Sequence, residues 1–149
     1  MGLVVVTAAD TVRKAVTDYI SALNAADINR ITGCVTEDFW NEHTAASGSN
    51  LRGRNAYRTR LKSFLADYRQ MNYAVEDLIV EGNRAALAYC MTYLWHGASP
   101  PRPVTTRGMF RFEVRDGLIA HRTDYRDSAN SKRQMEAPPP EPQPESSSQ

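Results

Sequence analysis

The chain has 149 residues, of which 42% are hydrophobic and 23% are charged, and its formal net charge at pH 7 is +1. These values are ordinary for one globular domain that is long enough to bury a core without metal or disulfide support. The Lys and Arg residues are scattered along the chain, so the electrostatic footprint of a nucleic-acid-binding protein is missing.

The two cysteines, Cys34 and Cys90, belong to no Cys/His group with the spacing of a zinc site. Phosphate-binding loops and nucleophile elbows are also absent from the sequence, so we expect no metal and no cofactor. No segment reads as a signal peptide or reaches transmembrane length. Two buried thiols in a reducing compartment are the default interpretation, and the sequence predicts a cytoplasmic protein without a membrane or nucleic-acid partner.

Three helices are expected in the first half of the chain. Thr7 and Asp10 fit a capping box, and the apolar residues that follow have helical spacing as far as Leu23. Asp27 is placed to cap a short second helix, Ile28–Cys34. A third helix is expected from Arg54 to about residue 68, with a continuous apolar stripe.

The strands are expected around these helices. A short strand, Phe39–His43, precedes a polar loop at residues 44–50. Four strands follow the third helix, at residues 71–81, 84–95, 105–115 and 118–127, with a proline-rich loop at 100–103, and no expected element contains an interior proline. This order predicts an α+β domain over residues 10–136, between an N-terminal arm (1–9) and a disordered Pro/Ser-rich tail (137–149). The tail is either inert or a ligand for a polyproline-reading domain.

The last hairpin turns at Asp116-Gly117, and the register of its two strands decides which face of the sheet carries Asp124. A two-residue turn with regular pairing places Asp124 on the face opposite Phe112. Asp124 reaches the interior only if a β-bulge near residues 121–123 shifts the register, and we predict such a bulge. The polar run at residues 121–127 is either a solvated strand end or the lining of a polar site.

Several short motifs occur in one order: Leu23-Asn-Ala-Ala-Asp27, Glu37-Asp38, Gly53-Arg54, and Phe-x-Val-x-Asp-Gly-x-Ile at 112–119. Over residues 10–135 the chain resembles the SnoaL-like branch of the nuclear transport factor 2-like superfamily. The resemblance implies a cone, in which a curved antiparallel or mixed sheet packs on three N-terminal helices and encloses a pocket, commonly in a homodimer. Members include polyketide cyclases, ketosteroid isomerase, limonene epoxide hydrolase and scytalone dehydratase, and many members only bind or assemble.

The resemblance also implies site residues. In the enzymes the strand after the acidic pair points two side chains into the cavity, at the positions of Asn41 and His43, and the isomerase has its general base where His43 stands. The family's acid/base aspartate on the last strand matches Asp124. The Arg-x-Asp pair of the epoxide hydrolase has no counterpart in Ala88–Trp95, which argues against epoxide hydrolysis by that triad.

A histidine and an aspartate in one pocket can transfer protons next to a carbonyl. His43 and Asp124 are therefore the candidate catalytic residues, and the alternative is a histidine hydrogen-bonded to the wall of a binding pocket. Arg122 is either an anion-binding group or an ordinary ion-pair partner. The other candidate ligand-binding residues, which can equally be core, are Asn41, Tyr19, Trp40, Phe64, Tyr93, Trp95, Phe110 and Phe112.

Together with these residues, the resemblance implies a protein that binds a hydrophobic small molecule similar to a polyketide, terpenoid or steroid. If it is an enzyme, we expect cofactor-free isomerisation, cyclisation or dehydration by acid–base chemistry. The competing hypotheses are a non-catalytic ligand-binding or dimeric assembly module, and a partner-binding protein that acts through its tail.

Overall fold

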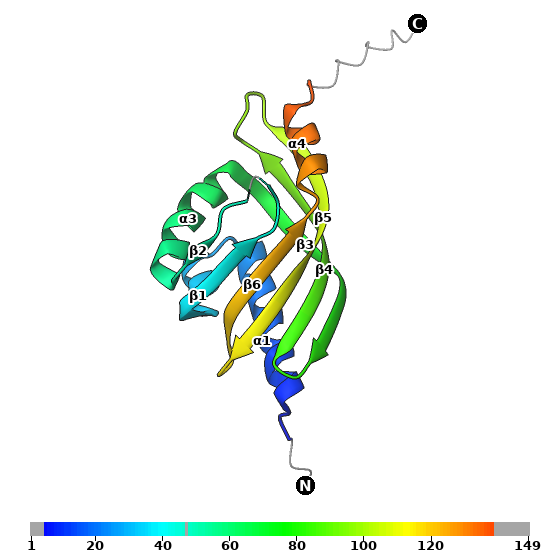
Figure 1. Ribbon diagram of the computed structural model, residues 1–149. Coiled ribbons are helices and arrows are strands. Elements are labelled where there is room, and N and C mark those ends of the chain that lie inside the picture. The colour runs from blue at the N-terminus through cyan, green and yellow to red at the C-terminus, as the bar shows by residue number, and fades with distance from the viewer. Residues whose placement is uncertain (1–4, 47, 139–149) are drawn as a thin grey trace, which may run out of the picture.

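The computed structural model describes residues 5–46 and 48–138, and these form helices packed on one sheet (Figure 1). The elements in chain order are α1 (Ala8–Asn24), α2 (Ile28–Gly33), β1 (Val35–His43), β2 (Leu51–Arg52), α3 (Arg54–Asp67), β3 (Tyr68–Glu81), β4 (Arg84–Trp95), β5 (Arg102–Arg115), β6 (Leu118–Arg126) and α4 (Ser128–Glu136).

The six strands form one open, mixed sheet in the order β2-β1-β6-β5-β4-β3. β1 and β6 run parallel, and every other neighbouring pair is antiparallel. α1 lies along one face of the sheet and α3 lies beside β1 and β2, while α4 packs on β5 (Figure 1). The inner face, against α1 and α3, holds the core, and the expected α+β class is confirmed.

The helix caps follow the sequence signals. The Thr7 hydroxyl accepts a hydrogen bond from the Asp10 amide, and the Asp10 carboxylate accepts one from the Thr7 amide, so the predicted capping box is confirmed. Asp27 caps α2 through the amide of Arg30, as expected. Both caps fix where the chain enters a helix.

The predicted β-bulge is present, one residue earlier than expected. Val114 pairs with Ile119, but Glu113 pairs with His121, so Ala120 is the extra residue on β6. From this point Asp124 lies opposite Phe110 and its side chain turns to the inner face, where it is 2% exposed. One inserted residue therefore decides that Arg122, Asp124 and Arg126, the alternate residues of this polar run, face the interior.

The structure differs from the sequence analysis in two additional elements and in one proline that lies inside a strand. The sequence analysis assigned no element to the residues of β2 and α4, and both are short segments with few buried residues. Pro103 lies inside β5, which corrects the expectation that no element interior contains proline. It is tolerated there because β5 extends past the last β6 pair, Gly108–Arg126.

The end of β5 that lacks a strand neighbour is instead covered by α4. The Gln134 side chain accepts a hydrogen bond from the Thr105 amide and donates one to the Thr105 carbonyl, as a neighbouring strand would. These hydrogen bonds hold α4 against β5, directly after the end of β6 in the chain. From residue 139 on, the predicted tail lies outside the described residues.

Candidate active site

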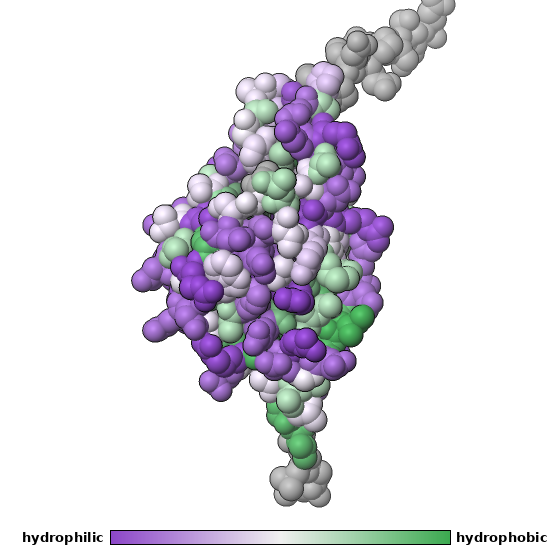
Figure 2. Space-filling view, viewed as in Figure 1, coloured by the Kyte–Doolittle hydropathy of each residue, from purple (hydrophilic) through white to green (hydrophobic). Residues whose placement is uncertain are grey.

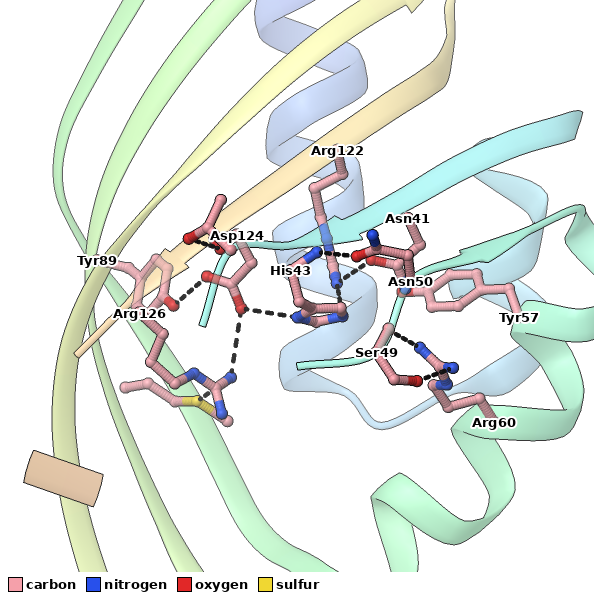
Figure 3. Close-up of polar contacts among 12 residues, drawn as sticks. Asn41, His43, Ser49, Asn50, Tyr57, Arg60, Tyr89, Arg122, Asp124 and Arg126 are labelled. Atoms are coloured by element: carbon pink, nitrogen blue, oxygen red, sulfur yellow. Dashed lines mark hydrogen bonds and ion pairs between the residues drawn. The ribbon is translucent and has the colours of Figure 1, made fainter. Parts of the chain in front are cut away.

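The parallel pairing of β1 and β6 brings the candidate residues together. Asn41 is paired with Arg122 and His43 with Asp124, and alternate residues of both strands face inward. Arg126 follows on the same face of β6. These five residues, which we call the inner cluster, lie together in Figure 3.

The inner cluster borders a cavity of about 70 Å³. Its lining residues are Leu23, Asn41, His43, Tyr57, Arg60, Leu61, Phe64, Tyr73, Arg122, Asp124 and Arg126. An outer groove of about 460 Å³ shares His43, Arg60, Phe64, Asp124 and Arg126 with the cavity and extends to α4. The charged groups of the cavity lie on its sheet side, and much of its apolar wall comes from Leu23 on α1 and from Leu61 and Phe64 on α3.

His43 lies where the cavity meets the groove, with its side chain 24% exposed. Its Nδ1 is 3.7 Å from Asp124 Oδ2, and its Nε2 is 3.5 Å from an Arg122 nitrogen. Burial, and then the charge of Arg122, lower the pKa of His43 to about 4, although Asp124 opposes this shift. The imidazole is therefore neutral at pH 7. These neighbours favour the tautomer with hydrogen on Nδ1, which leaves the lone pair on Nε2 beside the cavity.

Asp124 is held by a hydrogen bond and an ion pair. Tyr89 donates to its Oδ1 at 2.6 Å, and a terminal nitrogen of Arg126 lies 3.6 Å from its Oδ2. Burial and the negative charge of Asp124 raise the pKa of Tyr89 well above its ordinary value, so this phenol remains a donor. The carboxylate is thus oriented, with one oxygen facing both His43 and Arg126 (Figure 3).

Arg122 is buried among neutral groups. Its guanidinium donates to the Tyr19 hydroxyl at 2.5 Å and to Asn41 Oδ1 at 2.7 Å, and it lies 4.9 Å from the ring centroid of Phe110. Within the described residues, no carboxylate oxygen lies within 4.0 Å of it. The ordinary ion-pair partner considered from sequence is therefore wrong, and the anion-binding alternative stays a prediction.

The structure brings five of the predicted residues to the cavity: Asn41, His43, Phe64, Arg122 and Asp124. The other six do not line the cavity or the outer groove. Tyr19, Phe110 and Phe112 lie behind Arg122 in the core, while Tyr93 and Trp95 pack on Tyr68. Trp40 faces the other side of the sheet, under Arg52.

The sequence analysis did not identify Arg126, Arg60, Tyr57 or Tyr89 as part of the site. Arg126 had a readable signal, because it follows Asp124 at the strand period of two and so shares its face. Arg60 follows Tyr57 by three residues on α3, and that spacing puts both on one helix face. Tyr89 gave no such signal, since it belongs to a buried alternating pattern typical of core.

The opposite face of the same two strands carries a second polar group. Glu42 Oε1 accepts a hydrogen bond from the Thr123 hydroxyl at 2.9 Å and lies 3.0 Å from His121 Nε2, with Trp40 beside His121. We call Trp40, Glu42, His121 and Thr123 the outer cluster. Because its polar groups satisfy one another, it needs no further partner.

Within residues 5–46 and 48–138, no group of three His, Cys, Asp or Glu side chains is placed to hold a metal ion. None of the described helices is both long and apolar enough to cross a membrane.

Comparison with known proteins extends these observations. A family model of the SnoaL-like domain matches residues 16–122, and among curated proteins no relative matches. Three solved structures share the fold. A candidate polyketide cyclase from Xanthomonas campestris pv. campestris is 22% identical with a TM-score of 0.74, covering 87% of this chain and 99% of its own. A candidate SnoaL-like polyketide cyclase from Jannaschia sp. CCS1 is 17% identical with a TM-score of 0.78, covering 93% and 100%.

The third structure is an epoxide hydrolase of the limonene-epoxide-hydrolase-like type from M. tuberculosis, 19% identical with a TM-score of 0.74, covering 87% of this chain and 92% of its own. These identities establish a common fold and leave the activity open. Because the family model matches more than half of the 149 residues, the resemblance predicted from sequence is confirmed, and the chain belongs to the SnoaL-like domain family.

Proposed function

We propose that the protein binds a small molecule with an apolar body and moves a proton next to a carbonyl group, with His43 as the general base. The observation that carries this proposal is the neutral imidazole at the junction of cavity and groove, with Asp124 Oδ2 3.7 Å from its Nδ1. A histidine with a pKa of about 4 has the basicity of a carboxylate, for which about 4 is the ordinary value.

In this mechanism Nε2 of His43 removes a proton from the carbon beside the substrate carbonyl. The imidazolium that forms is stabilised by the Asp124 carboxylate, which Tyr89 and Arg126 hold in place. The negative charge that develops on the carbonyl oxygen is favoured by the positive field of Arg122. In an isomerisation the imidazolium returns the proton to another carbon. In a dehydration it gives the proton to the departing hydroxyl, which leaves as water, and in a cyclisation the enolate carbon attacks a second carbonyl whose oxygen takes the proton.

Exchange of hydrogen for deuterium tests the proton-transfer step without knowledge of the natural substrate. We expect the protein to accelerate exchange of the protons beside the carbonyl of phenylacetone in D₂O, followed by NMR. His43→Gln should reduce this rate by about 10²-fold or more, since general-base catalysis contributes that much. His121→Gln, which changes the same residue type in the outer cluster, should leave the rate unchanged. Exchange that survives His43→Gln would contradict the proposal.

The second candidate function is a dimeric assembly module. Ile79, Met109 and Tyr125 are each more than 40% exposed, and Met109 and Tyr125 are paired on the outer face of the sheet. Figure 2 shows hydrophobic residues interspersed with hydrophilic ones on the side seen in Figure 1. A homodimer that covers this face is consistent with these exposed side chains. Light scattering on wild type and Met109→Asp tests it: a wild-type dimer that becomes monomeric supports this candidate, and a monomeric wild type removes it.

A cytoplasmic location remains part of the proposal. It is supported by Cys34 and Cys90, which are both free thiols.

A further inference from the structure

Arg122 carries a charge that its surroundings do not balance. Its side chain is buried at 6% exposure, and a guanidinium stays protonated at every physiological pH. A buried charge is costly unless an opposite charge accompanies it. Its hydrogen-bond partners are Tyr19, Asn41 and, at 3.5 Å, the imidazole of His43, and all three are neutral. Its Nε has no acceptor within the described part of the chain.

The carboxylate of Asp124 belongs to other partners. Asp124 lines the cavity, but its Oδ1 accepts from Tyr89 and its Oδ2 faces Arg126 and His43. The cavity is therefore lined by three arginines and a single carboxylate. Arg122 lies beyond ion-pair distance of it.

Further cations surround the same space. Arg60 lines both the cavity and the outer groove, and among the described residues its side chain donates to Ser49 alone, through the carbonyl at 2.6 Å and the hydroxyl at 2.7 Å. Burial, and then repulsion by Arg122, lower the pKa of Arg60. Lys132 on α4 lines the groove as well. The charged residues that line the two spaces are Arg60, Arg122, Arg126 and Lys132, against Asp124, with His43 neutral. Lys132 also lies 3.9 Å from Glu136, outside these spaces, so among the described residues the lining cations without a carboxylate at ion-pair distance are Arg60 and Arg122.

We propose that the ligand of this site is an organic anion whose charge is shared by two planar oxygens, a carboxylate or an acidic enolate, with Arg122 as its counter-ion. This inference rests on the proposed function, because it assigns a substrate class to the same cavity. A cavity of about 70 Å³ admits such a group but not the body of a drug-sized ligand, which needs about 300 Å³ or more. The apolar body then lies in the outer groove against Phe64, Tyr68 and Met135.

The test is calorimetric binding of matched probes to the wild-type protein at pH 7. Benzoate and the enolate of dimedone carry the anion, and benzamide is the neutral match of benzoate. We expect one or both anions to bind at least about tenfold more tightly than benzamide, the ratio that one charge-assisted hydrogen bond supplies. Benzamide binding as tightly as benzoate, or no binding of either anion, would overturn the inference.

Substitutions locate the counter-ion. Arg122→Met should abolish the preference for the anion over benzamide. Because this variant replaces a buried group, Arg60→Gln serves as the second variant, and it should weaken benzoate binding several-fold without loss of folding. Arg115→Gln, an exposed arginine paired with Asp38 at the far end of β5, is the matched control and should change nothing. Benzoate binding that is unchanged in Arg60→Gln, with the anion preference intact in a folded Arg122→Met, would overturn the assignment.

His43→Gln separates the two proposals. Benzoate should still bind to this variant, since its counter-ion is Arg122. If neither benzoate nor the dimedone enolate binds to the wild type but phenylacetone exchange depends on His43, the substrate class is wrong and the proton-transfer function stands. If benzoate binds as expected but exchange does not depend on His43, the proton-transfer function is wrong and the anion site stands.

Discussion

The two faces of the β1–β6 pair carry similar polar residues, but these residues have their hydrogen-bond and charge partners on one face and lack some of them on the other. In the outer cluster, Glu42 accepts from the Thr123 hydroxyl and faces His121 at 3.0 Å, so carboxylate, hydroxyl and imidazole complete one another. In the inner cluster, His43 lies 3.7 Å from Asp124, beyond hydrogen-bond distance, and Arg122 meets only neutral partners.

Strand alternation alone separates these two groups, since neighbouring residues of the same strands supply both. A cluster whose polar groups are hydrogen-bonded to one another stabilises the fold and has no need of a ligand. An incomplete group at a cavity keeps donors, a lone pair and charge available, at a cost that the rest of the core offsets. The comparison therefore assigns structure to the outer cluster and binding to the inner one.

The largest expected effect comes from removing one carboxylate charge on each face. Asp124→Asn keeps an acceptor for Tyr89 but leaves Arg126 without its carboxylate, so we expect a loss of about 3 kcal/mol in the free energy of unfolding. Glu42→Gln, whose side chain is 34% exposed, should cost less than about 1 kcal/mol. Urea denaturation at pH 7 measures both, and equal losses would contradict the contrast.

A smaller effect is expected in the pH dependence of stability. The folded pKa of His43, about 4, lies below its unfolded value of about 6.5, so the unfolded state binds the proton first as the pH falls. This group's contribution is therefore complete above pH 6.5 and is lost progressively between pH 6.5 and 4. The wild type should lose about 2 kcal/mol more than His43→Gln between pH 7 and 4.5.

Urea denaturation at the two pH values measures this difference, and His121→Gln is the matched control on the outer face. A His121→Gln variant that loses the pH dependence as His43→Gln does would show that this dependence does not come from His43 and its buried neighbour Arg122.

The smallest effect distinguishes two buried tyrosines of β4. Tyr89→Phe leaves an oxygen of Asp124 without its donor and should cost about 1.5 kcal/mol. Tyr93→Phe is the matched control, because within the described residues its buried hydroxyl has no hydrogen-bond partner, and its loss should cost nothing. Thermal denaturation of both variants compares them, and a Tyr93→Phe variant as destabilised as Tyr89→Phe would contradict the role given to Tyr89.

The sequence carried enough information for the helices and the long strands, because their signals are local. Thr7, Asp10 and Asp27 are caps that act within three residues, and Gly82-Asn83 and Asp116-Gly117 are turns. β2 and α4 were missed because neither has a clear apolar period. α4 depends instead on the distant contact of Gln134 with Thr105.

The site residues, too, were predictable only in part from the sequence. Asn41, His43 and Asp124 were singled out by position within a family pattern. A bulge near residues 121–123, which the structure has at Ala120, was predicted from the conflict between turn geometry and that pattern. Aromatic residues could not be divided between core and cavity from sequence, because Tyr19, Phe110 and Phe64 have the same periodicity in either place. The neutral surroundings of Arg122 depend on α1, β1 and β5 together, so no local pattern contains them.

The most direct test of the account is the pKa of the His43 imidazole, followed by NMR across pH 3–8 in free protein and with benzoate. The account predicts titration near pH 4 in the free protein, because burial and Arg122 disfavour the imidazolium, and a higher value with benzoate, because the bound anion offsets Arg122. Titration near the ordinary value of about 6.5 in both states would contradict the claim that the inner cluster is an incomplete, cationic site.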